Sequence, residues 1–241
     1  MLALRVEGLQ AALGQNLILN QVSFSVNESE LAALVGANGA GKTTLLKVLA
    51  GRIRPAAGKI EIFGKPCSPA TRKLISYLPQ KSNLDPRFPL CVADVVQLGR
   101  TSWSFFHRNR KKETERVEWC LEQVGLTGLA KRPIGELSGG QQQLAFLART
   151  LYGNPRLVLL DEPTTGLDVT ARQRFYKLLK ELKQRLGLTF LIVTHDWEAV
   201  LAHADRVMLL EAQKITFQGC SQKAGEVLKP CLRVVDRDGN A

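Results

Sequence analysis

The stretch that decides the fold is Gly36-Ala37-Asn38-Gly39-Ala40-Gly41-Lys42-Thr43, which matches the pattern GxxxxGK[ST] in full. A buried-strand run, LAALVG (31–36), precedes it, and a helical segment from about Lys42 to Ala50 follows. Glycines let the backbone turn its N–H groups around phosphate oxygens, and a helix start adds partial positive charge. Lys42 supplies a point charge for phosphates and Thr43 a hydroxyl for Mg²⁺. The sequence therefore predicts a phosphate-binding loop rather than a chance glycine-rich turn.

A second pattern is the pair of acids that ends the apolar run LVLLDE (157–162). An acid at such a strand end can hold Mg²⁺ beside a terminal phosphate, and we assign this to Asp161. Glu162 would then face an attacking water as its general base. Alone, the pair would be read as two solvated acids, but the upstream phosphate-binding loop favours the catalytic interpretation.

Strand-like runs and helical segments alternate around these two motifs, which is typical of α/β proteins with crossover helices. We expect a P-loop fold with a mostly parallel sheet flanked by helices, an antiparallel N-terminal β-subdomain, and a helical lobe inserted at about 81–155. The domain would span 1–219, followed by a polar tail at 220–241. The expected strand runs are LRVEGL, LILNQVSFSV, LAALVG, KIEIFG (59–64), KLISYLP (73–79), LVLLD, LTFLIVTH (188–195), and a final hairpin of RVMLLEA and KITFQG.

Composition describes an ordinary globular protein. The chain has 241 residues, 45% of them hydrophobic and 23% charged, which excludes collagenous and disordered classes. We expect neither a membrane span nor a secretory signal, because the longest apolar runs are too short and the start lacks a basic region. Five scattered cysteines indicate reduced thiols. The net charge of +11 favours an acidic partner without identifying it.

A third motif is Leu137-Ser138-Gly139-Gly140-Gln141, directly before a helical segment. Ser138 is a good helix N-cap, and the glycines expose backbone donors. Taken alone, this is only a capping motif.

Together, the motifs resemble those of ATP-binding-cassette (ABC) ATPases. LSGGQ (137–141), between the P-loop and the DE strand, is similar to the family's signature motif. Gln80 in YLPQ is similar to the Q-loop, Thr165-Gly166-Leu167-Asp168 to the D-loop, and His195 to the switch histidine. The resemblance extends to about Gly219.

This resemblance implies an ATPase subunit of a transporter that uses ATP and Mg²⁺. Two copies would pack head to tail, so that the Ser138 turn of one caps the γ-phosphate held by Lys42 of the other. The catalytic residues would be Glu162, His195 and Gln80, and the Mg²⁺ ligands Thr43, Gln80 and Asp161. The nucleotide-binding residues would be Gly36, Ala37, Asn38, Gly39, Ala40, Gly41, Lys42, Thr43, Thr44, Ser138, Gly139, Gly140 and Gln141.

The resemblance also implies partners: an integral membrane permease subunit and, indirectly, a solute-binding protein, at the cytoplasmic face of the cell inner membrane. Two positions depart from the family. Leu13 stands where an aromatic residue usually stacks on adenine, so it offers apolar contact without a π face. Leu144 stands where a basic residue is frequent.

The segment after Gln80 bears on the cargo. Phe88-Pro89, Val92 and the run 94–100 (DVVQLGR) resemble ATPases of bacterial manganese, zinc and iron(II) importers. ATPases of siderophore, heme and cobalamin importers are similar at Leu98-Gly99-Arg100, so these remain an alternative. The interval from Gln80 to Leu137 is too short for the long coiled coils of DNA-repair relatives.

A basic stretch with interleaved aromatics lies in the same interval. It comprises Arg100, Trp103, Phe105, Phe106, His107, Arg108, Arg110, Lys111 and Lys112. We favour contact near an anionic membrane surface, then a solvated loop, and last single-stranded nucleic acid. A soluble nucleic-acid-associated ATPase is therefore the less favoured alternative.

Overall fold

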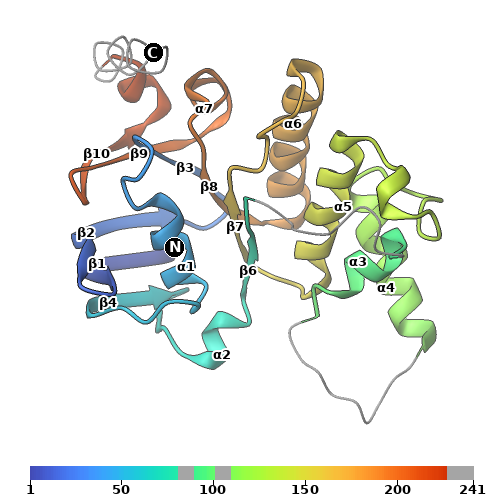
Figure 1. Cartoon of the computed structure of the whole chain (residues 1–241), viewed down its shortest axis with the longest axis horizontal. Helices are drawn as coiled ribbons and strands as arrows, with labels where there is room; N and C mark the ends of the chain where they lie inside the picture. The colour runs from blue at the N-terminus through green and yellow to red at the C-terminus, as the bar shows by residue number, and fades with distance from the viewer. Residues whose placement is uncertain (81–89, 101–109, 227–241) are drawn as a thin grey trace.

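The computed structural model describes residues 1–80, 90–100 and 110–226. A six-stranded sheet runs through the middle in the order β10-β9-β3-β8-β7-β6 (Figure 1). Neighbouring strands from β9 to β6 are parallel, and β10 pairs antiparallel with β9. The strands are β3 (Leu31–Val35), β6 (Ile75–Leu78), β7 (Leu157–Asp161), β8 (Thr189–Val193), β9 (Arg206–Glu211) and β10 (Lys214–Cys220). Every residue of β3, β7 and β8 is buried, as expected for a parallel sheet covered on both faces.

A smaller antiparallel sheet has the order β2-β1-β4-β5. Its strands are β1 (Leu2–Leu13), β2 (Asn16–Asn27), β4 (Ala57–Ile62) and β5 (Lys65–Pro66). Helix α1 (Lys42–Leu49) lies between the two sheets and buries Leu45, Leu46, Val48 and Leu49 in a core shared by both (Figure 1). The short helix α2 (Pro69–Arg72) links this sheet to β6.

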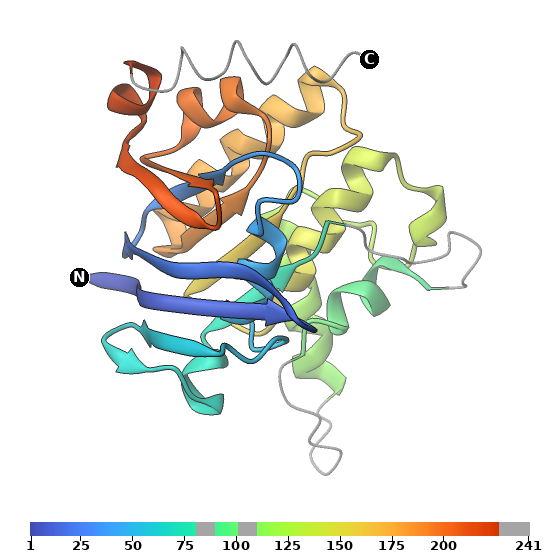
Figure 2. The same ribbon diagram turned by 60° about the vertical axis from the view of Figure 1, so that its left-hand side comes forward.

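Helices cover the opposite face of the large sheet and form a second core (Figure 2). They are α3 (Val92–Gln97), α4 (Arg110–Gln123), α5 (Gly139–Tyr152), α6 (Val169–Leu186) and α7 (Trp197–His203), with a 3₁₀ turn at Ile134–Glu136. Side chains of β3 point alternately to the two faces of the sheet, so the strand contributes to both cores. Those that face the helices are Leu31, Ala33 and Val35, and those that face α1 are Ala32 and Leu34. Helices α3, α4 and α5 fall inside the predicted insertion.

The fold class is confirmed, but several boundaries differ from the sequence prediction. Strand β6 is shorter than KLISYLP, and β8 ends at Val193, so His195 lies beyond the strand. At the far end, β10 continues to Cys220, residues 221–226 are helical, and Ala224 is fully buried in the helical core. Apolar packing therefore continues past Gly219. Over the ranges that the structure describes, no helix is long and apolar enough to cross a membrane.

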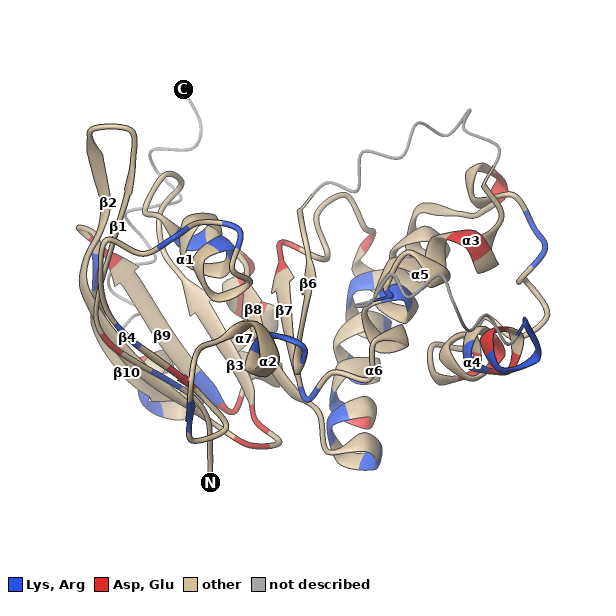
Figure 3. Cartoon of the chain, turned by 90° about the horizontal axis from the view of Figure 1, so that it is seen from below, with Lys and Arg blue, Asp and Glu red and all other residues tan. Residues whose placement is uncertain are grey.

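Part of the predicted basic stretch lies outside the described residues: Trp103, Phe105, Phe106, His107 and Arg108. The Phe88-Pro89 pair, on which the cargo prediction partly rests, also lies outside them. The described end of the basic stretch opens α4, where both charge signs occur along one helix (Figure 3). Arg110 and Lys111 are exposed, whereas Arg100 forms an ion pair with Glu113. The basic character thus ends within the first turns of α4.

Candidate functional site

The predicted phosphate-binding loop connects β3 to α1 at the carboxyl edge of the large sheet. Two of its glycines are required by close contacts. A Cβ on Gly36 would lie 2.2 Å from the carbonyl oxygen of Leu210, and one on Gly41 would lie 2.9 Å from Leu19 Cδ2. Gly41 also has φ +103°, a conformation that residues with a Cβ rarely adopt. The local fold therefore depends on the same glycines that expose backbone N–H groups.

Lys42 begins α1 and is only 7% exposed. Its Nζ donates hydrogen bonds of 2.8 Å to the carbonyl oxygens of Gly36 and of Ala37. Burial lowers the pKa of Lys42, and the carboxylates of Glu162 and Asp161 oppose that shift. The Lys42 ammonium group therefore joins the end of the loop to its beginning. It could exchange these two carbonyl oxygens for phosphate oxygens without leaving the loop.

Asp161 ends β7 and is 1% exposed, so its carboxylate needs partners. Oδ1 accepts a hydrogen bond of 3.0 Å from Thr43 Oγ1, and Oδ2 accepts one of 3.0 Å from the Tyr77 hydroxyl. Thr43 and Asp161 thus place a hydroxyl and a carboxylate side by side next to the loop. Hard oxygen donors of this kind are the ligands that Mg²⁺ prefers, so the residues present fit the predicted ion.

Tyr77 is the functional candidate that the sequence analysis missed. Strand β6 alternates so that Ile75 and Tyr77 face the α1 core, whereas Leu78 faces the helices. Because Tyr77 pairs with Leu159 in register, Asp161 lies two residues further along the same face of β7. The sequence does show a hydroxyl group, that of Tyr77, in the strand that contains YLPQ. It points to Asp161 only once β6 and β7 are known to be neighbouring strands.

Glu162 follows β7 in a left-handed conformation, φ +48°, that is uncommon for a residue other than glycine. Its backbone N–H donates to Val193 O at 2.9 Å, which holds the turn. Its side chain is 8% exposed, and Oε2 lies 2.8 Å from Nδ1 of His195, whose side chain is 66% exposed. The structure therefore brings the predicted base and the predicted histidine together.

Gln80 lies two residues beyond the end of β6 and is exposed. Since Leu78 pairs with Leu160, Gln80 follows the strand that neighbours Asp161. The structure thus places Gln80 near the same edge of the sheet as the two acids.

The Ser138 turn lies elsewhere in the fold, at the start of α5 in the helical layer (Figure 1). Ser138 Oγ accepts from the Gln141 N–H at 3.3 Å, and Gln141 Oε1 accepts from the Ser138 N–H at 3.1 Å, which completes a capping box. A Cβ on Gly140 would lie 3.5 Å from that of Ala171 in α6. An open groove of about 820 Å³ connects this turn to Gly166 and Asp168. The predicted cap is thus confirmed, and the turn is separate from the phosphate-binding loop.

The glycine-rich loop, Asp161 at the end of β7 and the neighbouring Glu162 together are the arrangement of a P-loop nucleoside triphosphatase. Comparison with known proteins gives the family, because residues 19–165 match the ABC transporter family. The chain belongs to this family and is an ATPase of the ABC type.

Similar proteins belong to transport systems, and two of them, TroB and MntB, are named as ATP-binding proteins. The chain is 41% identical to the zinc transport protein TroB of Treponema pallidum over 88% of this chain and 80% of TroB. It is 39% identical to the manganese transport protein MntB of Listeria monocytogenes over 88% of each chain. It is 43% identical to YfeB of Yersinia pestis, named for chelated iron transport, over 78% of this chain and 64% of YfeB.

Solved structures agree with the fold. A transporter described as metal-chelate type, in an inward-facing conformation, has a TM-score of 0.81 at 34% identity and covers 92% of this chain and 85% of that one. The ADP conformation of MJ1267, an ATP-binding cassette, has a TM-score of 0.87 at 27% identity over 98% of each chain.

The close contact at Gly36 gives a prediction about stability. Gly36→Ala forces a Cβ against the Leu210 carbonyl, so β3 or β9 must shift, and we expect a loss of about 1–3 kcal/mol in the free energy of unfolding. Urea unfolding of the full chain measures it. Gly139→Ala is the matched control, because a Cβ there meets nothing within 4 Å. Equal stability of the two variants would contradict the argument.

Proposed function

We propose that this chain is the ATP-hydrolysing subunit that drives import of a divalent transition metal: manganese, zinc or iron. The observation that supports this cargo is the similarity to TroB and MntB, each matched over 88% of this chain. Import of an iron chelate, heme or cobalamin is the second candidate, favoured by YfeB and by the metal-chelate transporter. Nucleic acid is the less favoured partner.

Nucleotide binding would use the loop residues 36–44. Lys42 would release the carbonyl oxygens of Gly36 and Ala37 and pair with the β- and γ-phosphates, while backbone N–H groups surround the phosphate oxygens. Charge-assisted hydrogen bonds to phosphate are stronger than those to carbonyls, which favours this exchange.

Magnesium would be held by Thr43 and Asp161, with Gln80 approaching from the end of β6. When bound, the ion supplies charge that stabilises the phosphate oxygens of the transition state. The Thr43–Asp161 hydrogen bond keeps both oxygen donors together before the nucleotide arrives. Tyr77 fixes the second carboxylate oxygen and so limits its rotation.

Hydrolysis would use Glu162 as the general base. Its carboxylate would accept a proton from the water that attacks the γ-phosphate in line. The bond between the γ-phosphorus and ADP would break, which releases ADP and inorganic phosphate. His195 pairs with Glu162 in the present arrangement and would turn to the γ-phosphate in the catalytic one. The exposure of His195 leaves room for that change.

A second copy would complete the site head to tail. The turn formed by Ser138, Gly139, Gly140 and Gln141 would face the γ-phosphate held by Lys42 of the other copy. Two features of the turn support this. It lies at the start of α5, beside an open groove, so its backbone N–H groups could meet an anion. It also lies in the helical layer, apart from the phosphate-binding loop of its own chain. ATP would close this dimer and hydrolysis would reopen it.

The proposed organisation is an ATPase domain at 1–219 with its helical lobe at 81–155 and a tail at 220–241, of which Cys220 still belongs to β10 and Ala224 packs in the helical core. The assembly would lie at the cytoplasmic face of the cell inner membrane, bound to an integral membrane permease subunit. A solute-binding protein would take part indirectly, by delivering the cargo to the permease.

Glu162→Gln tests the general-base role. The amide cannot take the proton, so we expect hydrolysis to fall about a hundredfold or more while ATP binding persists. The variant should elute as a dimer from gel filtration in ATP. Glu118→Gln, an exposed acid on α4, is the control and should behave like the parent chain. A monomeric Glu162 variant with normal turnover would refute the role.

Leu13→Tyr tests how the base of the nucleotide is held. Leu13 and Leu17 are 49% and 39% exposed at the tip of the β1–β2 hairpin, whose Ile18 and Leu19 pack against Gly41. A ring there would stack on the base, and we expect ATP affinity to rise about two- to tenfold by calorimetry.

Leu2→Tyr is the control, because Leu2 is 38% exposed at the opposite end of β1. An equal gain in this variant, or none in Leu13→Tyr, would place the base away from the hairpin tip.

The cargo is tested by uptake. The chain is co-purified with the membrane subunit encoded beside it and reconstituted in vesicles containing ATP and Mg²⁺, with the accompanying solute-binding protein outside. We expect accumulation of radioactive manganese or zinc and little of a chelated iron. Uptake of the chelate alone would support the second candidate.

A further inference from the structure

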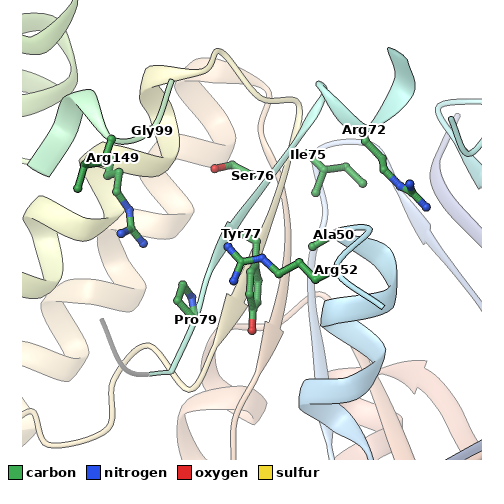
Figure 4. Close-up of a pocket in the computed structure, with 10 residues that line it drawn as sticks. Ala50, Arg52, Arg72, Ile75, Ser76, Tyr77, Pro79, Gly99 and Arg149 are labelled. Carbon is green, nitrogen blue, oxygen red and sulfur yellow. The ribbon is translucent and has the colours of Figure 1, made fainter. Parts of the chain in front are cut away.

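The hydroxyl group of Tyr176 lies in the helical core. Tyr176 belongs to α6 and is 1% exposed, and within the described ranges its hydroxyl oxygen makes no hydrogen bond. Tyr77 on strand β6 (Figure 4) shows the usual arrangement, because its hydroxyl donates to Asp161 at 3.0 Å. A buried hydroxyl that lacks such a partner costs stability, so the Tyr176 hydroxyl requires an explanation.

Two neighbouring rings fix the position of this hydroxyl. The imidazole of His203, at the end of α7, stacks on the Tyr176 ring with 5.1 Å between the ring centres and 2° between the planes. Phe175 contacts the same ring edge to face, with the centres 6.5 Å apart. Because the tyrosine ring is packed on both of these neighbours, it cannot swing toward an acceptor. A partner therefore has to move to the hydroxyl.

The hydroxyl groups of Thr164 and Thr194 are polar neighbours of the Tyr176 hydroxyl. Burial raises the pKa of Tyr176, and the hydroxyls of Thr194 and Thr164 lower it. Among the described contacts, neither threonine forms a hydrogen bond with it. Thr164 lies two residues after Glu162, and Thr194 directly precedes His195. Tyr176 therefore lies beside the two loops that carry the proposed base and the proposed histidine.

The two loops are tied to the sheet with different strength. The loop of Thr164 begins at Glu162, whose N–H donates to Val193 O at 2.9 Å. The loop of Thr194 begins with its own N–H, which is 3.4 Å from Leu34 O and so exceeds the ordinary length of a backbone hydrogen bond. Thr194 is therefore the neighbour that can move more readily toward Tyr176.

Helix α6 also anchors the far end of the Thr194 loop. Arg172, one turn before Tyr176, donates from Nη1 to Asp196 Oδ2 at 2.8 Å. Thr194 Oγ1 accepts from the Asp196 N–H at 3.0 Å. A hydroxyl oxygen can accept two hydrogen bonds, so Thr194 can also accept one from Tyr176. The loop thus has a fixed end at Asp196 and a suitable acceptor at its start.

We propose that Tyr176 is a positioning residue whose hydroxyl donates to Thr194 when His195 turns from Glu162 to the γ-phosphate. This inference rests on the roles proposed above for Glu162 and His195. In the present arrangement, His195 pairs with Glu162, and the described structure offers the Tyr176 donor no partner. Once His195 has turned, the donor is satisfied, so the new hydrogen bond favours the catalytic arrangement over the present one.

Tyr176→Phe removes the hydroxyl and keeps the stacked ring. Because the hydroxyl lacks a partner in the part of the chain that the structure describes, we expect the nucleotide-free variant to melt at or above the temperature of the parent chain. We expect kcat for ATP hydrolysis to fall about three- to tenfold with KM for ATP unchanged, since the bond forms only after ATP has bound. A melting temperature lowered by about 2–4 °C with normal kcat would show a merely structural hydroxyl and overturn the proposal.

Tyr152→Phe is the matched control, because it also removes one tyrosine hydroxyl. Tyr152 ends α5, and its backbone carbonyl accepts from Arg116 of α4, so it lies within the helical lobe. This variant should keep the kcat and KM of the parent chain. An equal fall of kcat in both tyrosine variants would overturn a specific role for Tyr176.

Two threonine variants identify the acceptor. In Thr194→Val the acceptor is absent, so adding Tyr176→Phe should cause no further fall in kcat. In Thr164→Val the acceptor remains, and adding Tyr176→Phe should still lower kcat about three- to tenfold. Equal falls in the two backgrounds would overturn the assignment to Thr194.

Failure of the proposed function would give a different result. If Glu162→Gln hydrolyses ATP normally, the general base lies elsewhere, whereas the melting temperature of Tyr176→Phe still shows whether the hydroxyl has a partner. If Glu162→Gln loses turnover as expected and Tyr176→Phe keeps the parent kcat, the positioning role alone is overturned.

Discussion

The buried carboxylate of Asp161 is the constraint on which the site depends. At 1% exposure its oxygens cannot rely on water, and each is satisfied by a hydroxyl from a different element. Thr43 comes from the first turn of α1, and Tyr77 comes from the neighbouring strand β6. The carboxylate therefore fixes the phosphate-binding helix against the sheet edge. These are also the two oxygens that we propose as ligands of Mg²⁺.

Parallel topology explains why residues distant in the sequence meet at this edge. The phosphate-binding loop follows β3, Asp161 ends β7 and His195 follows β8. These three strands are consecutive in the sheet and run in the same direction. Their carboxyl ends therefore lie together, as expected for ligand sites in open α/β sheets. The backbone N–H of Glu162 donates a hydrogen bond to the carbonyl oxygen of Val193. This bond ties β7 to β8 at the point where the side chains of Glu162 and His195 meet.

Local patterns predicted the parts of the site that a short segment can encode. The glycine loop, the acids after LVLLD and the Ser138 cap each depend on neighbours within about four residues, and the structure places all three as expected. The contact of Tyr77 with Asp161 could not be predicted, because it depends on which strand lies beside β7. Periodicity predicts a strand and its faces but not its lateral neighbours. The packing of Ala224 was missed for a similar reason, since one small apolar residue gives no periodic signal.

The large sheet divides the protein into two packing layers, and this division makes its edge important. Alternation along β3 and β7 keeps the α1 core and the helical core on opposite faces, so few side chains can contact both. Strand β6 is one of the two edge strands, and on it Tyr77 faces one core and Leu78 faces the other. Near this strand, Gly99 lies against the backbone of Arg149, where a Cβ on Gly99 would be 1.9 Å from the Arg149 carbonyl oxygen. The absence of a side chain at Gly99 therefore allows the end of α3 to pack closely on α5. On this edge strand, the Tyr77 hydroxyl is the contact that joins β6 to the buried Asp161 carboxylate, so the packing of the edge bears directly on how that carboxylate is held.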